Sequence, residues 1–203
     1  MDKIVYIRSM TREDVSAMVK WTKHENPLFF HYNFPQMSER DCDRWFYERT
    51  KRMGRRNFII ENKEREIVGY MSIRNIKLFG RSSELGIVMN PAQMNKKYGR
   101  SAILKFMEYY FYNMNMKKLK LRVAEYNERA LKCYESCGFK NLGQRYELFE
   151  DQDSEVFTND KYKEYKKYFR YKRDRKLLKY IHMEITKEKY EEIKISQENM
   201  VLE

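Results

Sequence analysis

The stretch from Leu121 to Phe139 reads LRVAEYNERALKCYESCGF and decides the fold. It opens with a short apolar run, typical of a buried strand, and continues through Asn127 into a segment with helical periodicity from Glu128 to Ser136. Asn is a favoured N-cap, and a Gly directly after a helix is a common stop. A strand that feeds a capped helix brings backbone N–H groups and a side-chain amide to one point, where they can face a ligand.

The length and composition favour one domain over residues 1–203. With 203 residues, of which 42% are hydrophobic, the chain has enough apolar side chains for a core, so global disorder is excluded. No run approaches the roughly 20 apolar residues that a membrane-spanning helix needs. The first residues, MDKIVYIRS, lack the apolar region of a secretory signal, and we expect a cytoplasmic protein without membrane contact.

The three cysteines do not indicate a metal site. Cys133 and Cys137 are four residues apart on one predicted helix, and in principle they could share a metal ion. Zinc needs further ligands, and the three histidines show no ligand spacing. We therefore expect free thiols and no metal.

Around the deciding stretch, the hydrophobic pattern predicts alternating layers of strands and helices. Strands are predicted at 3–8, 57–61, 66–76, 83–90, 119–124, 141–149 and 177–186, and helices at 11–23, 38–54, 100–113 and 128–136. The strand at 83–90 is apolar enough to be buried on both faces. This order is an α+β pattern, followed by a polar C-terminal tail at 187–203.

The strand, Asn127, Ala130, Tyr134 and the Gly138-Phe139 pair occur at the spacing of the second cofactor motif of the GCN5-related N-acetyltransferases. The chain resembles this family, and within it the branch of spermidine and ribosomal-protein acetyltransferases. The resemblance implies a central mixed, mostly antiparallel, splayed sheet flanked by helices. It also implies acetyl-CoA as co-substrate, and an acetyl group transferred by direct attack of an amine.

The resemblance assigns the cofactor contacts to three segments. On the strand SELGIVMNP they are Ile87, Val88 and Met89, whose backbone would bind the pantetheine arm and polarise the thioester. The loop before the next helix would hold the diphosphate through Met94, Asn95, Lys96, Lys97, Tyr98, Gly99, Arg100 and Ser101. The third segment supplies Asn127, Ala130 and Tyr134.

The loop at 94–101 departs from the family pattern at two positions. Met94 replaces the usual Gln or Arg, and Lys97 replaces the first Gly, so only Gly99 matches. A non-Gly residue held at positive φ costs about 1 kcal/mol. We therefore expect a distorted cradle, or one in which lysine charges hold the phosphates. An alternative is a non-catalytic module that binds CoA or a protein partner.

Two residues are predicted to move protons. Tyr134 matches the family tyrosine that protonates the leaving CoA thiolate, and a phenol is acidic enough for that task. Glu84, at the start of the strand that binds the cofactor, is the best carboxylate to deprotonate the amine, and His31 is the alternative base. Core packing for Tyr134 and a surface position for Glu84 are the competing structural interpretations.

The acceptor is predicted to bind at the aromatic loop 27–35. It would be a primary amine: a polyamine, another small molecule or a protein N-terminus. Polyamine sites gather several acids, and near this loop the chain offers Glu25, Glu39 and Asp41, but also Asn33 and Asn75. Polyamine specificity is therefore one candidate among several.

The segment 158–179 carries much of the net charge of +12. Its ten basic residues against three acids give 10 − 3 = +7. Within the insertion 158–176, tyrosines recur every three residues at Tyr162, Tyr165, Tyr168 and Tyr171. The pattern suits a basic helix that packs its tyrosines on the sheet. It also suits contact with RNA or the ribosome, where the enzyme would acetylate an RNA-borne or ribosomal amine, or a homo-oligomer interface.

Overall fold

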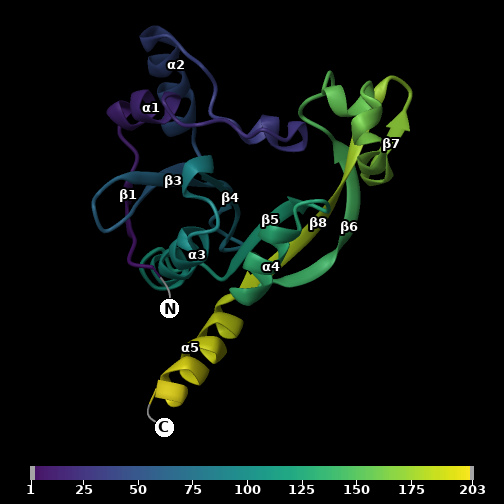
Figure 1. Ribbon diagram of the computed structural model, residues 1–203. Helices are drawn as coiled ribbons and strands as arrows, with labels where there is room; N and C mark the ends of the chain where they lie inside the picture. Colours follow the sequence, from purple (N-terminus) through teal and green to yellow (C-terminus); the bar gives the residue numbers. More distant parts are fainter. Residues whose placement is uncertain (1–2, 202–203) are drawn as a thin grey trace.

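The computed structural model describes residues 3–201, without the side chains of 197–201. An eight-stranded sheet forms its centre, with strands in the order β1-β2-β3-β4-β5-β8-β6 and β7 paired to β8 (Figure 1). The strands are β1 (Tyr6–Ser9), β2 (Arg56–Glu61), β3 (Ile67–Lys77), β4 (Ser82–Met89), β5 (Lys118–Ala124), β6 (Lys140–Leu148), β7 (Phe169–Lys172) and β8 (Arg175–Thr186). All neighbours are antiparallel except β4 and β5. This mixed, mostly antiparallel α+β arrangement confirms the predicted fold class.

Helices cover both faces of the sheet (Figure 1). On one face, α1 (Arg12–Val19) and α2 (Glu39–Thr50) pack over β2 to β4, where Val15, Ile59 and Tyr70 share a cluster. On the other face, α3 (Tyr98–Glu108) and α4 (Glu128–Ser136) pack against β5 in the largest cluster of the core. The last helix is α5 (Lys187–Val201).

The strands β4 and β5 separate shortly after they meet. Their parallel pairing covers only Ser82–Glu84 of β4 and Lys118–Lys120 of β5. Beyond Glu84 no described strand pairs with the β5 side of β4. The predicted splay of the sheet is therefore present, and it leaves a backbone edge open in the middle of the molecule.

The helix caps follow the sequence closely. Thr11 and Asp14 form a capping box at α1, and Ser38 Oγ accepts a hydrogen bond from the Asp41 N–H at α2. The Asn127 side chain caps α4, whose bounds agree with the prediction. Two helices end earlier than expected, α1 at Val19 and α2 at Thr50.

Three further expectations need correction. The strand at 83–90 is not buried on both faces, because β4 leaves β5 and only Ser83 and Leu85 are buried. The end of the helix predicted at 100–113 forms a π-helical turn, Tyr109–Asn113. The segment predicted as a polar tail folds as α5 up to Val201, and residues 202–203 lie outside the described part.

The basic insertion folds as a 3₁₀ helix, Asp160–Tyr168, followed by β7. A 3₁₀ helix has three residues per turn, so the tyrosine spacing of three places Tyr162, Tyr165 and Tyr168 on one side. These rings pack against a second apolar cluster that contains Phe149 and Phe169. Tyr171 lies on β7 instead and is exposed. The packing agrees with the simpler interpretation of the segment, while contact with RNA or another copy stays a prediction.

Within the described residues, no helix combines the length and the apolar character needed to cross a membrane.

Candidate active site

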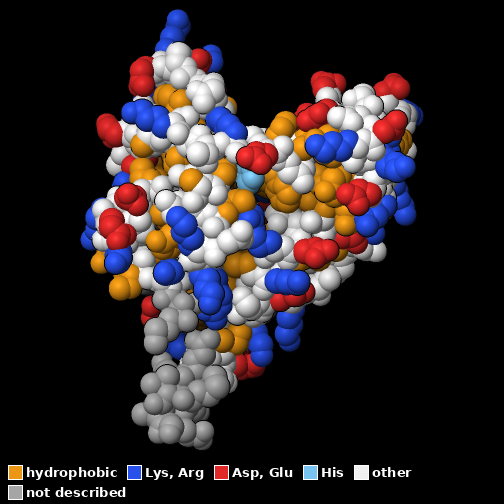
Figure 2. Space-filling model, viewed as in Figure 1, with side chains coloured by type: hydrophobic (Ala, Val, Ile, Leu, Met, Phe, Trp, Pro, Cys, Tyr) orange, Lys and Arg blue, Asp and Glu red, His pale blue; other side chains and the backbone are white. Residues whose placement is uncertain are grey.

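A cavity of about 540 Å³ opens where β4 and β5 separate. Its volume is in the range typical of small-molecule sites. All five residues from Leu85 to Met89 line it, although neighbouring side chains of a strand point to opposite faces. The cavity therefore reaches both faces of β4. Figure 2 shows a hollow in this side of the molecule, with a histidine and several basic side chains around it.

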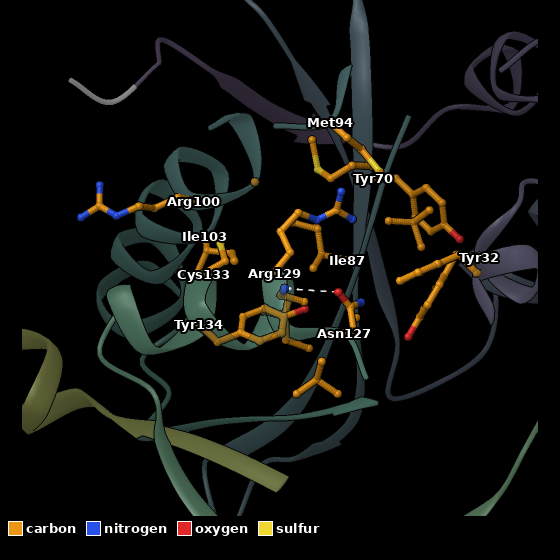
Figure 3. Close-up of a pocket in the computed structure, with 18 of the residues that line it drawn as sticks. Tyr32, Tyr70, Ile87, Met94, Arg100, Ile103, Asn127, Arg129, Cys133 and Tyr134 are labelled. Atoms are coloured by element: carbon orange, nitrogen blue, oxygen red, sulfur yellow. Dashed lines mark hydrogen bonds between the residues drawn. The ribbon is translucent and has the colours of Figure 1, made fainter. Parts of the chain in front are cut away.

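The two faces of the cavity differ in their surroundings. Ile87 and Met89 pack toward the core cluster of α3 and α4, whereas Val88 packs with Tyr70 toward α1 and α2. In Figure 3, Arg100, Ile103 and Cys133 lie on one side of Ile87, and Tyr32 and Tyr70 on the other. We call these sides the helix α3 chamber and the aromatic chamber.

The loop before α3 adopts the strained backbone that its sequence implied. Lys97 has φ 65°, in the left-handed region, and it occupies the N-cap position of α3, where its carbonyl accepts a hydrogen bond from the Ser101 N–H at 3.2 Å. Asn95 is also left-handed, with φ 63°. The expected positive φ at Lys97 is confirmed. The first turn of α3 begins directly at this loop, and the N–H groups at a helix start are an arrangement suited to an anion.

Most of the predicted cofactor residues lie in the cavity wall. They are Ile87, Val88, Met89, Met94, Asn95, Lys97, Tyr98, Gly99, Arg100, Asn127, Ala130 and Tyr134. The other two lie outside the wall. Lys96 Nζ donates to Gln93 Oε1 at 2.8 Å, and buried Ser101 accepts a hydrogen bond from the Lys3 N–H at 2.8 Å.

The start of α4 brings Asn127 and Tyr134 to the cavity. Asn127 is buried, and its Oδ1 accepts a hydrogen bond from the Ala130 N–H at 3.2 Å (Figure 3). Tyr134 lies half-buried two turns later, and its ring packs on Phe139 with centroids 5.9 Å apart. Burial raises the pKa of the Tyr134 phenol well above its usual value. The hydroxyl is therefore fully protonated at neutral pH.

The predicted base, Glu84, lies on β4 just before the strands separate and outside the cavity wall. Its carboxylate accepts hydrogen bonds from Arg74 Nη2 at 2.6 Å and Asn75 Nδ2 at 3.0 Å. Burial alone would raise the pKa of Glu84, but these two contacts and the positive charge of Arg74 outweigh it, and the pKa is lowered. A carboxylate held in this way is a weak base.

Two other candidate bases line the aromatic chamber, His31 and Glu150. Glu150 accepts hydrogen bonds from the Tyr180 hydroxyl at 2.8 Å and from Arg122 Nη2 at 3.1 Å. Both ring nitrogens of His31 are buried and have no hydrogen-bond partner among the described residues. Burial lowers the pKa of His31, so the ring is neutral at pH 7.

The acids expected for a polyamine site are not in the wall. Glu39 accepts a hydrogen bond from Arg12 at the start of α2, Asp41 pairs with Arg44, and Glu25 is exposed. Asn33 accepts a hydrogen bond from the His24 N–H, and Asn75 binds Glu84. In the described part of the chain, Glu150 is the single acid that lines the cavity.

Sequence reasoning missed six basic side chains of the cavity, Arg49, Arg55, Arg74, Arg122, Arg129 and Lys132. They come from α2, the turn before β2, β3, β5 and α4, and no motif connects these segments. The run KRMGRR at 51–56 is the one local signal of positive charge near this place.

The cysteines form no metal centre with other ligands in the described part of the chain, where no group of three or more His, Cys, Asp or Glu side chains gathers. Cys133 lines the cavity, and Cys137 is buried beside it.

Comparison with known families identifies the class. The model of the acetyltransferase (GNAT) domain matches residues 5–140, about two thirds of the chain. The protein belongs to this family and is an acetyltransferase, as the deciding stretch predicted.

Individual proteins and a solved structure are also similar to this chain. The chain is 24% identical to a spermidine N(1)-acetyltransferase of Vibrio cholerae over 83% of this chain and 94% of that protein. It is also 24% identical to a spermidine N(1)-acetyltransferase of Escherichia coli K12, over 69% of this chain and 75% of that protein. The crystal structure of the Vibrio cholerae spermidine N-acetyltransferase with CoA and spermine shares the fold, with a TM-score of 0.68 at 22% identity, over 92% of this chain and 97% of that one.

Proposed function

We propose that this acetyltransferase moves an acetyl group from acetyl-CoA to a primary amine by direct attack. The observation that carries the proposal is the cavity that reaches both faces of β4 beside an unpaired strand edge. A donor held in the helix α3 chamber and an amine in the aromatic chamber would meet at Ile87 and Val88. Holding both reactants in line removes most of the entropy cost of their encounter.

The helix α3 chamber suits the CoA part of the donor. The pantetheine arm would add along the open edge of β4 at Ile87, Val88 and Met89 through main-chain hydrogen bonds. The diphosphate would meet the first N–H groups of α3, with the positive charges of Lys97 and Arg100 beside them. Backbone N–H groups near Val88 and Met89 would hold the oxyanion that forms at the thioester carbonyl.

Tyr134 is the proposed acid. It lies at the cavity wall, and its raised pKa keeps the proton available until the C–S bond breaks. The departing thiolate has a conjugate acid with a pKa near 8.5 or above in water, and the burial that disfavours the phenolate of Tyr134 disfavours a free thiolate as well, so the sulfur takes up a proton as its charge develops. The phenol proton would then move from Tyr134 to sulfur.

The base remains a proposal with two candidates. Glu84 is the one that the sequence favoured, but its bonds to Arg74 and Asn75 weaken it. His31 is neutral, unpaired and in the wall of the aromatic chamber, which are the properties of a base that works near pH 7. His31→Gln would therefore lower turnover more than Glu84→Gln. A larger loss of turnover in Glu84→Gln than in His31→Gln would identify Glu84 as the base instead.

Calorimetry with acetyl-CoA tests the donor, and thiol release with a panel of amines tests the reaction. The names of the relatives make spermidine the first acceptor to try. Absence of acetyl-CoA binding at 100 μM would show that the chain is a non-catalytic member of the family.

Tyr134→Phe tests the acid with a minimal change of volume. We expect turnover to fall by about 10²–10⁴-fold with little change in acetyl-CoA affinity, because the ring still packs on Phe139. Tyr112→Phe is the matched control, since Tyr112 is exposed on the π-helical turn outside the cavity wall. Turnover that survives in Tyr134→Phe would remove this residue from the mechanism.

A further inference from the structure

The aromatic chamber carries positive charge that the described carboxylates neutralise only in part. Four arginines line it, from α2, the turn before β2, β3 and β5: Arg49, Arg55, Arg74 and Arg122. One acid, Glu150, lines it with them, and Glu84 and Glu147, which lie outside the wall, also contact these arginines, so 4 − 3 leaves a net charge of +1 at the cluster. Two of the arginines have partners: Arg74 pairs with Glu84 at 2.6 Å, and Arg122 contacts Glu150 and Glu147.

Arg49 and Arg55 are the unbalanced pair. The Nε of Arg55 is buried and has no hydrogen-bond partner in the described part of the chain. The Arg49 guanidinium lies over the Trp45 ring, 4.6 Å from its centroid, without a carboxylate beside it among residues 3–196. A buried donor that lacks a partner costs about 1–3 kcal/mol, so such a group persists where a ligand satisfies it.

The surroundings hold these two side chains in place. Arg49 sits one turn after Trp45 on α2, and the Arg49 carbonyl accepts a hydrogen bond from Asn57 Nδ2 at 2.6 Å. Between Arg49 and Arg55 the chain turns at Gly54, which has φ 74°. The Gly54 carbonyl accepts a hydrogen bond from the Ile76 N–H at 3.3 Å. Burial and the nearby positive charges of Arg49 and Arg74 lower the pKa of Arg55. The cluster is therefore preorganised for a negative charge.

The phosphates of CoA are not the natural occupant of this cluster. The anion-binding end of α3 lies in the other chamber, across β4, with Lys97 and Arg100. The arginine cluster faces Tyr70, Ser72 and Gly86, on the face of the sheet that α1 and α2 cover. This is the side that the amine would occupy.

Resting on the proposed function, we propose that the acceptor is a primary amine that also carries a carboxylate or phosphate, which Arg49 and Arg55 bind. The planar guanidinium of arginine matches both anions with paired N–H donors. A polycation such as spermidine would meet net positive charge here and few acids.

The register of the sheet sets the spacing between the amine and the anion. Asn57, two residues after Arg55, pairs with Ser72, which pairs with Gly86. Arg55 itself lies two residues before this row, level with Glu84, which is four residues before Val88, the proposed position of the thioester. The backbone separation along the strand direction is therefore roughly 13 Å, and the long arginine side chain spans part of it. Amines whose anionic group lies several bonds away are therefore preferred over α-amino acids.

The test compares matched acceptors with the wild-type protein. One series is glycine, β-alanine, 4-aminobutyrate and 6-aminohexanoate, each beside its neutral amide. A second is 2-aminoethyl and 3-aminopropyl phosphate, and spermidine is the polycation. We expect kcat/KM at least 10-fold higher for the anionic amines of the preferred length than for their amides and for spermidine. The two series separate carboxylate from phosphate recognition.

Variants connect the preference to the cluster. Arg55→Gln should lower kcat/KM for anionic amines by about 10–100-fold, mainly through KM, and leave neutral amides unchanged. Arg52→Gln removes an exposed arginine of the same turn that does not line the cavity, and it should behave as wild type. Arg55→Lys, which keeps the charge but not the paired donors, should show an intermediate loss.

A binding measurement keeps the inference independent of turnover. With CoA present at saturation, inorganic phosphate should raise the melting temperature of wild type and Arg52→Gln but not of Arg55→Gln. Equal shifts in all three would overturn the anion site. Wild type that binds acetyl-CoA and prefers spermidine or neutral amides overturns this inference and keeps the proposed function, whereas no acetyl-CoA binding at all overturns the proposed function itself.

Discussion

Gly138→Ala is predicted to be strongly destabilising, because Gly138 ends the helix that presents Tyr134. Its N–H donates to the Glu135 carbonyl at 2.9 Å, and its φ of 91° lies where side chains are strained. A Cβ built on Gly138 would lie 2.2 Å from Ile193 Cδ1 and 3.3 Å from Ile185 Cδ1. Two separate costs therefore act on this substitution, one in the backbone and one in the packing.

The two costs have different sizes. The positive φ costs an alanine about 1–2 kcal/mol. The close contact adds about 1–3 kcal/mol of overpacking, of which the flexible end of Ile193 relieves a part. Alanine has less conformational freedom than glycine in the unfolded chain, and this stabilises the folded variant by about 0.5–1 kcal/mol. The free energy of unfolding should fall by about 2–4 kcal/mol.

Gly143→Ala is the matched control. Gly143 has φ 119° at the bulge of β6, and a Cβ there would meet nothing within 4 Å. It should cost about 1 kcal/mol, the backbone part alone. Urea unfolding measures the loss of unfolding free energy in each variant, and the difference between the two losses reports the packing of α5 on the turn at Gly138. Adding Ile193→Ala to Gly138→Ala should recover most of that difference. Equal costs for the two glycines would refute the reasoning.

Three other substitutions test parts of the frame around the site. Lys97→Gly should raise the free energy of unfolding by up to about 1 kcal/mol, because glycine accepts the φ of 65° without strain; thermal unfolding that shows a loss would contradict this. Burial raises the pKa of Asp14, but hydrogen bonds from Arg8, one of them 2.7 Å long, outweigh it and the pKa is lowered. The stability that Asp14 adds is therefore present above its ordinary pKa near 3.9 and is lost as the pH falls through the lowered value. Asp14→Asn should lower the free energy of unfolding by about 1–3 kcal/mol at pH 7 and make that free energy depend less on pH in the acid range. Tyr126→Phe leaves the buried Leu28 carbonyl without its 2.7 Å hydrogen bond and should cost about 1–3 kcal/mol in urea unfolding, unless water reaches that carbonyl.

The parts of the fold that local chemistry decides could be predicted from the sequence. The bounds of α4 follow from the Asn127 cap and the Gly138 stop, and the left-handed Lys97 follows from its place in the loop motif. The tyrosine spacing predicts a helix in the basic insertion, and its period of three is the period of the 3₁₀ helix that forms there.

The charge of the aromatic chamber could not be predicted in the same way. Arg55 and Arg74 are distant along the chain, and they meet because β2 and β3 pair in one register. The prediction of Glu84 as the base did not include its ion pair with Arg74 for the same reason, because the two residues become neighbours only through the pairing of β3 and β4. Composition shows how many charges a chain has, and the register of the sheet decides which of them remain without partners.

The alternation along β4 has a consequence for how such a protein changes. Ile87 and Met89 face the helix α3 chamber, and Gly86 and Val88 face the aromatic chamber. Substitutions at even positions can therefore remodel acceptor choice while the donor contacts stay the same. An insertion or deletion of one residue in the turn between β3 and β4 is different, because it would exchange the two sets at once. The hairpin should tolerate new side chains far more readily than a new length.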